Sequence, residues 1–255
     1  MTDKKSLLYN LDEQQQILFA HIYDLSARAY SSGRDFYSCF LSENECALLK
    51  ARESCLPIAP QLFGGYGGAM RNMAGFVPEY IEPHFPISAV AVTARSFSSL
   101  SHRDFLGSLM SLGIKREKCG DIVINENCCH IFLQSDIAEF VKDNLVKVKN
   151  TGVSVSVENA EDVAVPERKF VTVKGTVASL RLDAVLSLAV GKGRGKCAEY
   201  IQTGRVFVDG VCTAKPDMHL QNGCTLTVRG VGKMLVEVSG NSKKGRIFVT
   251  LNKFA

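Results

Sequence analysis

The chain has 255 residues, of which 46% are hydrophobic and 22% are charged. This composition is ordinary for a globular protein, and the length allows one large domain or two to three small ones. No run approaches the roughly 18 uninterrupted apolar residues of a membrane-spanning helix. Residues 1–5 lead into a polar helix and not into a signal-type apolar stretch, so we expect a cytoplasmic protein with no membrane partner.

Nine cysteines are many for such a chain, but their number is odd and no Cys-x-x-Cys pair occurs. We therefore expect reduced thiols. Cys128, Cys129 and His130 look metal-like, yet neighbouring residues of a strand point to opposite faces. We interpret them as packing residues of a hairpin, and we predict no metal site.

The net charge of +4 hides a strong asymmetry. Residues 1–167 hold 15 Lys/Arg against 21 Asp/Glu, whereas residues 168–255 hold 15 against 5. The first part is therefore acidic and the second strongly basic. A basic block on folded sequence indicates a polyanionic partner, most often nucleic acid, although charge alone also allows lipid head groups.

The N-terminal segment predicts a polar amphipathic helix from Asp12 to Tyr30. A second helix is expected to begin at Ser42, where Ser42 and Glu45 form a capping box, and to end at Pro57 and Pro60. The glycine-rich segment that follows runs from Phe63 to Gly68, with Arg71 close behind. It suits either a phosphate cradle or a tight strand-to-strand turn, and the turn is favoured because the Gly-Lys-Ser/Thr ending of a nucleotide loop is missing.

The next segment alternates strands and helices in the order β-α-β-β-α-β. The expected elements are a strand 87–93, a helix 101–112, a hairpin 121–125 and 129–134, a helix 135–145 and a strand 153–157. This order is typical of ferredoxin-like folds, which RNA-recognition domains also use. The exposed aromatic pairs of those domains are missing, since Val123 and Phe132 suit a core equally well, so stacking of single-stranded bases is not supported.

These patterns predict an α+β protein of three parts. We expect an N-terminal α+β domain over residues 1–78, a ferredoxin-like, RRM-like domain over 79–160, a polar linker over 161–172 and a small basic domain over 173–255.

The basic segment contains two short helices, a helix stop at Gly204 and strands that turn at Asp209-Gly210. Four cations are expected around the two helix starts, where free amides and the helix dipole attract phosphate. They are Arg181, Lys192, Arg194 and Lys196. We expect Arg205 and Lys215 to extend this strip, and an ordinary solvated face is the alternative.

The order Arg181-Leu182-Asp183, the basic start of the second helix, the run Ile201 to Gly210 and Lys215-Pro216 together resemble the alpha-L RNA-binding module first known from ribosomal protein S-four. The resemblance covers about residues 176–229. It implies that Arg181 and Arg194 contact RNA phosphates and that Asp183 has a partly structural role. The family usually has Ser or Ala around the second-helix arginine, whereas Gly193 and Gly195 flank Arg194 here. Glycine raises the entropic cost of ordering this helix start, so we expect a weaker or altered contact.

The whole chain resembles the YlmH family. The resemblance rests on Phe63-Gly64-Gly65-Tyr66, Arg71, Pro78-x-Tyr80, the run His102 to Leu109 and the run Leu112 to Ile122. It implies a bacterial, ribosome-associated factor without a cofactor or catalytic residues. It further implies binding to rRNA of the large ribosomal subunit, with tRNA as a second candidate, in ribosome-associated quality control and alanine tailing. We expect a monomer off the ribosome.

A second RNA contact is a hypothesis for the segment around the first helix of the central domain. Its candidate residues are Arg71, His102, Arg103, Lys115, Arg116 and Lys118. Ordinary surface charges are an equally good interpretation.

Two other functions remain open. An RNA modification enzyme such as a pseudouridine synthase carries the same RNA-binding module, but Arg181-Leu182-Asp183 lies inside that module here, and no second such tripeptide occurs upstream. A membrane-surface adaptor would need a basic amphipathic helix, and no segment combines an apolar face with clustered cations.

Overall fold

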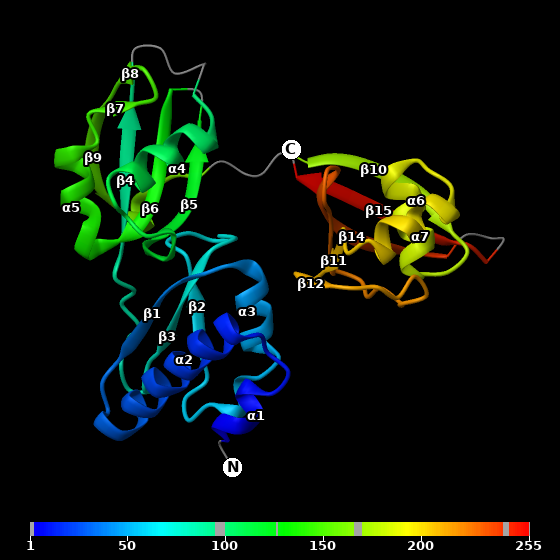
Figure 1. Ribbon diagram of the computed structural model, residues 1–255, viewed down its shortest axis with the longest axis horizontal. Helices are drawn as coiled ribbons and strands as arrows, with labels where there is room; N and C mark the ends of the chain where they lie inside the picture. Colours follow the sequence, from blue (N-terminus) through cyan, green and yellow to red (C-terminus); the bar gives the residue numbers. More distant parts are fainter. Residues whose placement is uncertain (1–2, 95–99, 126, 166–169, 242–244, 255) are drawn as a thin grey trace. The chain divides into compact units, whose positions relative to one another are not determined.

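The computed structural model describes residues 3–94, 100–125, 127–165, 170–241 and 245–254. The chain divides into two compact units, Met1–Pro166 and Glu167–Ala255 (Figure 1). Within the described residues, no helix is both long and apolar enough to cross a membrane. The protein is an α+β protein, as the alternating patterns predict.

The first part of unit 1 consists of helices packed on a small antiparallel sheet of order β1-β3-β2. Its elements are α1 (Lys4–Leu8), α2 (Glu13–Ser32), β1 (Phe36–Leu41), α3 (Glu43–Lys50), η1 (Glu53–Cys55), β2 (Gln61–Phe63) and β3 (Asn72–Phe76). Helix α2 begins at the predicted Asp12, which forms a capping box with Gln15, and ends at Gly33 with φ 66°.

The capping box that was predicted at Ser42 is confirmed, because the Ser42 amide donates to Glu45 Oε2 at 2.6 Å. The predicted end of this helix is wrong. Helix α3 ends at Lys50, before either proline, and η1 follows it. Leu56, which is 5% exposed, follows η1 and joins the hydrophobic core that also contains Ile22 and Leu49.

The second part of unit 1 has the predicted β-α-β-β-α-β order. Its elements are β4 (Ile87–Thr93), α4 (His102–Ser111), η2 (Arg116–Lys118), β5 (Cys119–Ile124), β6 (Cys128–Gln134), α5 (Ser135–Asn144), β7 (Lys147–Val148), β8 (Thr151–Gly152), β9 (Ser154–Asn159) and η3 (Ala160–Asp162). The four-stranded sheet has order β5-β6-β4-β9 with antiparallel neighbours, which is the ferredoxin-like arrangement. Phe105 of α4 and Val141 of α5 pack on one face of this sheet.

The N-terminal part of the same unit covers one end of the opposite face of the central sheet, whereas Thr93, Ser154 and Ser156 on that face are exposed. Phe132 of β6 is fully buried and packs with Phe40 and Met73. The ring of Tyr66 lies 4.8 Å from the ring of Phe132 between centroids. The interpretation of Phe132 as a core residue is therefore confirmed, and this ring has no free face for a nucleobase.

The glycine-rich segment is the connection between the antiparallel strands β2 and β3, as the favoured interpretation predicts. Gly65 has φ 97°, and a Cβ atom there would lie 2.5 Å from Cδ1 of Phe132. Only glycine therefore allows the backbone to approach the central sheet so closely.

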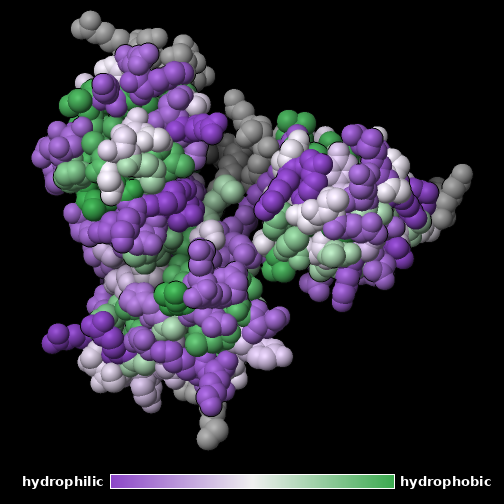
Figure 2. All heavy atoms as spheres, viewed as in Figure 1, coloured by the Kyte–Doolittle hydropathy of each residue, from purple (hydrophilic) through white to green (hydrophobic). Residues whose placement is uncertain are grey.

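Unit 2 is a six-stranded sheet of order β10-β15-β14-β13-β11-β12 with two helices. Its elements are β10 (Phe170–Val177), α6 (Leu182–Val190), α7 (Arg194–Gln202), β11 (Val206–Val208), β12 (Val211–Cys212), β13 (Thr225–Val228), β14 (Gly232–Asn241) and β15 (Ile247–Phe254). The helices bury Leu186 and Ile201 against one face of the sheet. Hydrophilic side chains dominate the visible surface of this unit (Figure 2).

The predicted turns of unit 2 are confirmed. Gly204 follows the end of α7 with φ 66°, and Asp209 and Gly210 both have positive φ between β11 and β12. Part of the range predicted as linker, residues 161–172, is regular structure, since η3 reaches Asp162 and β10 begins at Phe170.

Candidate nucleic-acid interface

The start of α7 is an open, basic helix end. Residues 191–196 are all exposed, and Lys192, Arg194 and Lys196 project from them. Gly193 is the N-cap, and no side chain of the described residues caps the helix. A Cβ atom at Gly193 or Gly195 would meet no atom within 4 Å, so the backbone here is accessible. Uncapped amides surrounded by cations favour a phosphate.

The start of α6 differs from the expectation of free amides. The Leu182 amide donates to Met218 O at 2.8 Å, and the Asp183 amide donates to Pro216 O at 3.0 Å. The loop that contains Lys215 and Pro216 therefore caps α6 with its own carbonyls. The expectation of a phosphate-binding helix end is wrong for α6, because its first amides already have partners.

Arg181 and Asp183 form an ion pair at this helix start. Arg181 Nε donates to Asp183 Oδ1 at 3.1 Å, and Arg181 Nη2 donates to Oδ2 at 3.2 Å. These hydrogen bonds lower the pKa of Asp183, and the charge of Arg194 lowers it further. Arg181 keeps 41% of its side chain exposed, whereas Asp183 keeps 12%.

An aromatic ring links the start of α7 to the strands. Arg205 lies 4.5 Å from the ring centroid of Tyr200, and Lys192 Nζ lies 5.8 Å from it. Arg205 also donates to the carbonyl of Arg229 at 3.0 Å. Arg229 in turn lies 5.0 Å from the ring centroid of Phe207. These contacts orient the cations without neutralising them.

Arg229 and Tyr200 were missed by the sequence analysis. Strand β13 pairs with β11, and this pairing places Arg229 beside Arg205, 24 residues away in sequence. Lys215 is exposed in the loop that caps α6. We define Lys192, Arg194, Lys196, Arg205 and Arg229 as the basic strip.

Two residues of the predicted second contact, Arg71 and Arg116, form hydrogen bonds within the fold. Arg71 donates to Cys119 O at 2.9 Å and to Phe40 O at 3.0 Å, so its guanidinium joins the two parts of unit 1. Arg116 donates to Cys119 O at 2.6 Å. Both guanidinium groups are thus engaged by backbone carbonyls and hold the fold together.

The other four candidates lie nearer the surface. Lys118 Nζ lies 2.5 Å from Asp136 Oδ2, and Lys115 Nζ lies 3.9 Å from Glu117 Oε1. His102 and Arg103 are exposed in the first turn of α4. Burial of part of the imidazole lowers the pKa of His102, and the charge of Arg116 lowers it further. We therefore expect a neutral His102 at pH 7, which contributes little to phosphate binding.

The hairpin residues alternate as predicted. Cys129 is buried in the core, whereas Cys128 and His130 share the other face, with Cys128 Sγ 3.7 Å from His130 Nε2. His130 Nε2 lies 3.5 Å from Glu158 Oε2. Burial and the charge of Glu158 raise the pKa of Cys128, so its thiol is not activated. In the described parts of the chain, no three His, Cys, Asp or Glu residues are placed to hold a metal ion.

Comparison with known proteins gives three findings. A family model described as a putative RNA-binding domain in YlmH matches residues 82–162, which contain the ferredoxin-like part of unit 1. Ribosome-associated protein quality control protein P2 of Bacillus subtilis is 33% identical over 219 residues, which are 84% of this chain and 85% of that protein. The structure of cell division protein YlmH from Streptococcus pneumoniae matches with a TM-score of 0.52 and 18% identity, over 61% of this chain and 98% of that one. The fold of that protein is thus shared. Because the Bacillus relative matches over most of both chains, this chain belongs to the YlmH family.

Proposed function

We propose that this protein is a non-catalytic RNA-binding factor of ribosome-associated quality control. In this proposal it binds rRNA of the large ribosomal subunit in the presence of a stalled peptidyl-tRNA and supports C-terminal alanine tailing. The observation that carries the RNA-binding part is the exposed, uncapped start of α7 with Lys192, Arg194 and Lys196 around it.

The basic strip suits a structured RNA backbone better than a flexible lysine tail would. The arginine guanidinium can hold two phosphate oxygens at once. Tyr200 and the carbonyl of Arg229 restrict Arg205 in advance, so less side-chain entropy is lost on binding. Arg181 is exposed enough to contact a phosphate, but its guanidinium already forms an ion pair with Asp183. We therefore expect Arg194 to contribute more than Arg181.

The ribosomal part of the proposal rests on the relatives. The Bacillus protein is named for ribosome-associated quality control, and the matched family model is named for RNA binding. The large subunit, the tRNA and alanine tailing come from the resemblance to the YlmH family. The enzyme alternative gains no support from Asp183, because its two carboxylate oxygens are held by Arg181 at a helix start.

The salt dependence of RNA binding tests the role of the basic strip. Binding of the full chain to ribosomal RNA should weaken with rising salt, and Arg194→Gln should reduce the log–log slope by roughly 0.7–0.9 for one lost phosphate contact. Lys174→Gln is the matched control, because Lys174 is also exposed but lies on β10. If the two variants gave the same salt-dependence slope, Arg194 would not contact phosphate at the interface.

Sedimentation tests the ribosomal assignment separately. In sucrose gradients of cell extract at low salt, the protein should travel with large ribosomal subunits and should be released at high salt. Absence from every ribosomal fraction at low salt would contradict the assignment, whatever the RNA affinity of the isolated chain.

A further inference from the structure

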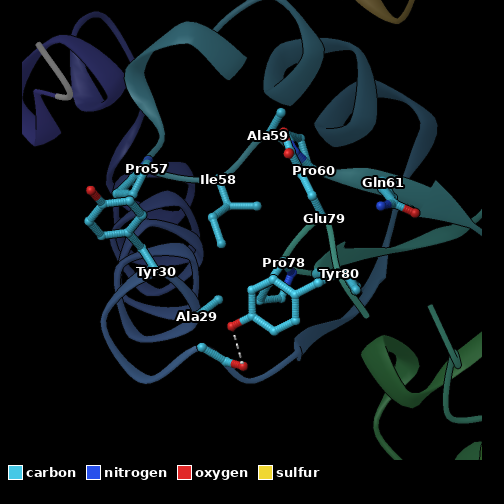
Figure 3. Close-up of a pocket in the computed structure, with 12 residues that line it drawn as sticks. Ala29, Tyr30, Pro57, Ile58, Ala59, Pro60, Gln61, Pro78, Glu79 and Tyr80 are labelled. Atoms are coloured by element: carbon cyan, nitrogen blue, oxygen red, sulfur yellow. Dashed lines mark hydrogen bonds between the residues drawn. The ribbon is translucent and has the colours of Figure 1, made fainter. Parts of the chain in front are cut away.

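A cleft of about 590 Å³ opens in the first part of unit 1, beside the last turn of α2 (Figure 3). Its walls come from the end of α2, from residues 57–61 before and at the start of β2, and from residues 77–80 after β3. Ala29 and Ile58 lie between the exposed rings of Tyr30 and Tyr80. Pro57, Pro60 and Pro78 stiffen the walls.

Two sets of hydrogen bonds fix the walls of the cleft. The buried hydroxyl of Ser26 donates to Ile58 O at 3.0 Å and accepts from the Ile58 amide at 2.9 Å. The Tyr80 hydroxyl donates to Gly33 O at 3.0 Å, although the Tyr80 residue remains 77% exposed. Because the cleft is formed in advance, little conformational entropy is lost when a ligand binds.

The cleft has the opposite electrostatic character to the basic strip. Glu79 is the only charged residue among those that line it. The C-terminal end of α2 adds partial negative charge, and the last turn of this helix contains no basic side chain. Arg34 follows the cap but does not line the cleft. A phosphate is disfavoured here, whereas a cation between tyrosine rings and a carboxylate is favoured.

One rim of the cleft continues into a sheet edge. Gln61 lines the cleft and is the first residue of β2, which is the outer strand of the β1-β3-β2 sheet. An extended peptide can pair with such an edge while a side chain enters the neighbouring cleft.

We propose that this cleft docks an extended segment of a partner protein through a Lys or Arg side chain. The cationic side chain enters between Tyr30 and Tyr80 and faces Glu79, and the peptide backbone runs along β2. This is a protein-binding role additional to RNA binding, and the acidic unit 1 performs it. An RNA ligand is the competing possibility that the experiment must separate.

The chain contains no tryptophan, so the fluorescence of a single introduced tryptophan reports on its own surroundings. Tyr30→Trp in the full chain places the sole indole at the cleft, at a residue that is 72% exposed and therefore tolerant of the change. Ala59→Trp, at another exposed lining residue, is a second reporter should the first variant fold poorly. The probe is the blocked peptide acetyl-Val-Lys-Val-Lys-Val-amide. Two comparison peptides carry Gln or Glu in place of both lysines.

The proposal expects saturable changes in emission with the Lys peptide and weaker binding of the Gln and Glu peptides. Adding Glu79→Gln to the reporter should weaken the Lys peptide about two- to fivefold, as for a partly exposed ion pair. Glu13→Gln is the matched control at the other end of α2 and should have no effect. Equal affinity for the Lys and Gln peptides, no saturable response in either reporter, or tighter binding of octauridylate at the indole would overturn the proposal.

Discussion

The hydroxyl of Tyr66 donates a hydrogen bond to Asp121 Oδ2 at 2.7 Å and so connects the glycine-rich loop to the central sheet. The same carboxylate accepts from the Met70 amide at 2.7 Å and from the Arg71 amide at 3.1 Å. One side chain of β5 therefore satisfies three donors of the loop between β2 and β3. A carboxylate held at this position disfavours an anionic ligand in the loop.

Replacing Asp121 by Ala should destabilise unit 1 by at least about 2 kcal/mol, because three donors lose a charged acceptor. Tyr66→Phe should cost about 1 kcal/mol, since it removes one of these hydrogen bonds. Urea unfolding followed by circular dichroism measures both. Tyr9→Phe is the control, at a tyrosine that is 78% exposed, and an equal loss there would contradict the role of the Tyr66 hydroxyl.

Gly65→Ala should be strongly destabilising, by about 2 kcal/mol or more, because the new methyl group would overlap the Phe132 ring at a backbone angle unfavourable to L residues. Gly67→Ala in the same loop should be close to neutral, since no atom lies within 4 Å of its Cβ position. A comparison of thermal midpoints tests the pair. Similar midpoints for both variants would show that the loop does not rest on the sheet.

The ion pair of Arg181 and Asp183 predicts a pH-dependent stability of unit 2. The guanidinium of Arg181 lowers the pKa of Asp183 below its ordinary value of 3.8, so the folded state binds this proton less readily than the unfolded state does. The resulting stabilisation is present above about pH 4 and is lost as the pH falls through the lowered pKa. Asp183→Asn removes it. The stability difference between wild type and variant should therefore be largest near neutrality and should shrink in acid, and a constant difference would contradict the pairing.

Tyr200 should affect RNA binding through the cations that it orients. Tyr200→Leu removes the ring that Arg205 and Lys192 contact and should weaken binding about two- to fivefold, in line with about 0.5–1 kcal/mol for an exposed cation–π contact. Tyr200→Phe keeps the ring and should bind almost as the wild type does. Fluorescence anisotropy with labelled ribosomal RNA provides the measurement. A loss in the Phe variant equal to that in the Leu variant would assign the effect to the hydroxyl.

Alkylation of thiols offers a test of the core. Cys212 is exposed and should react first with iodoacetamide at neutral pH. Burial raises the pKa of Cys46 and of Cys224 to about 11, so these thiols should react only on unfolding. Mass spectrometry of timed digests distinguishes the sites. Early labelling of Cys46 would show that α3 opens readily.

Local patterns predicted the elements well where periodicity and caps agreed. The strand 87–93 matches β4, and Ser42 and Asp12 begin their helices as expected. The hairpin at Asp209-Gly210 follows from residues that accept positive φ. These features depend on neighbours in sequence, and a single sequence therefore contains them.

The cations were harder to interpret because their partners are distant in sequence. Arg71 was a candidate for an RNA contact, with an ordinary surface charge as the alternative, yet its guanidinium donates to the carbonyls of Cys119 and Phe40, which are 48 and 31 residues away in sequence. The capping of α6 by the carbonyls of Pro216 and Met218 is also invisible in the sequence. A count of charges identifies a basic region, whereas the accessible members of that region depend on tertiary contacts.

The buried side chain of Phe132 on the central sheet also determines how this protein can be divided into fragments. The family match ends at residues 82 and 162, and such a fragment would contain every strand and helix of the ferredoxin-like part. It would nevertheless uncover Phe132, which Phe40, Met73 and Tyr66 shield in the intact unit. We expect that fragment to aggregate, since exposed apolar patches of this kind promote association. The segment that matches the family model is therefore smaller than the packed unit that buries Phe132, and expression should start from the complete first unit.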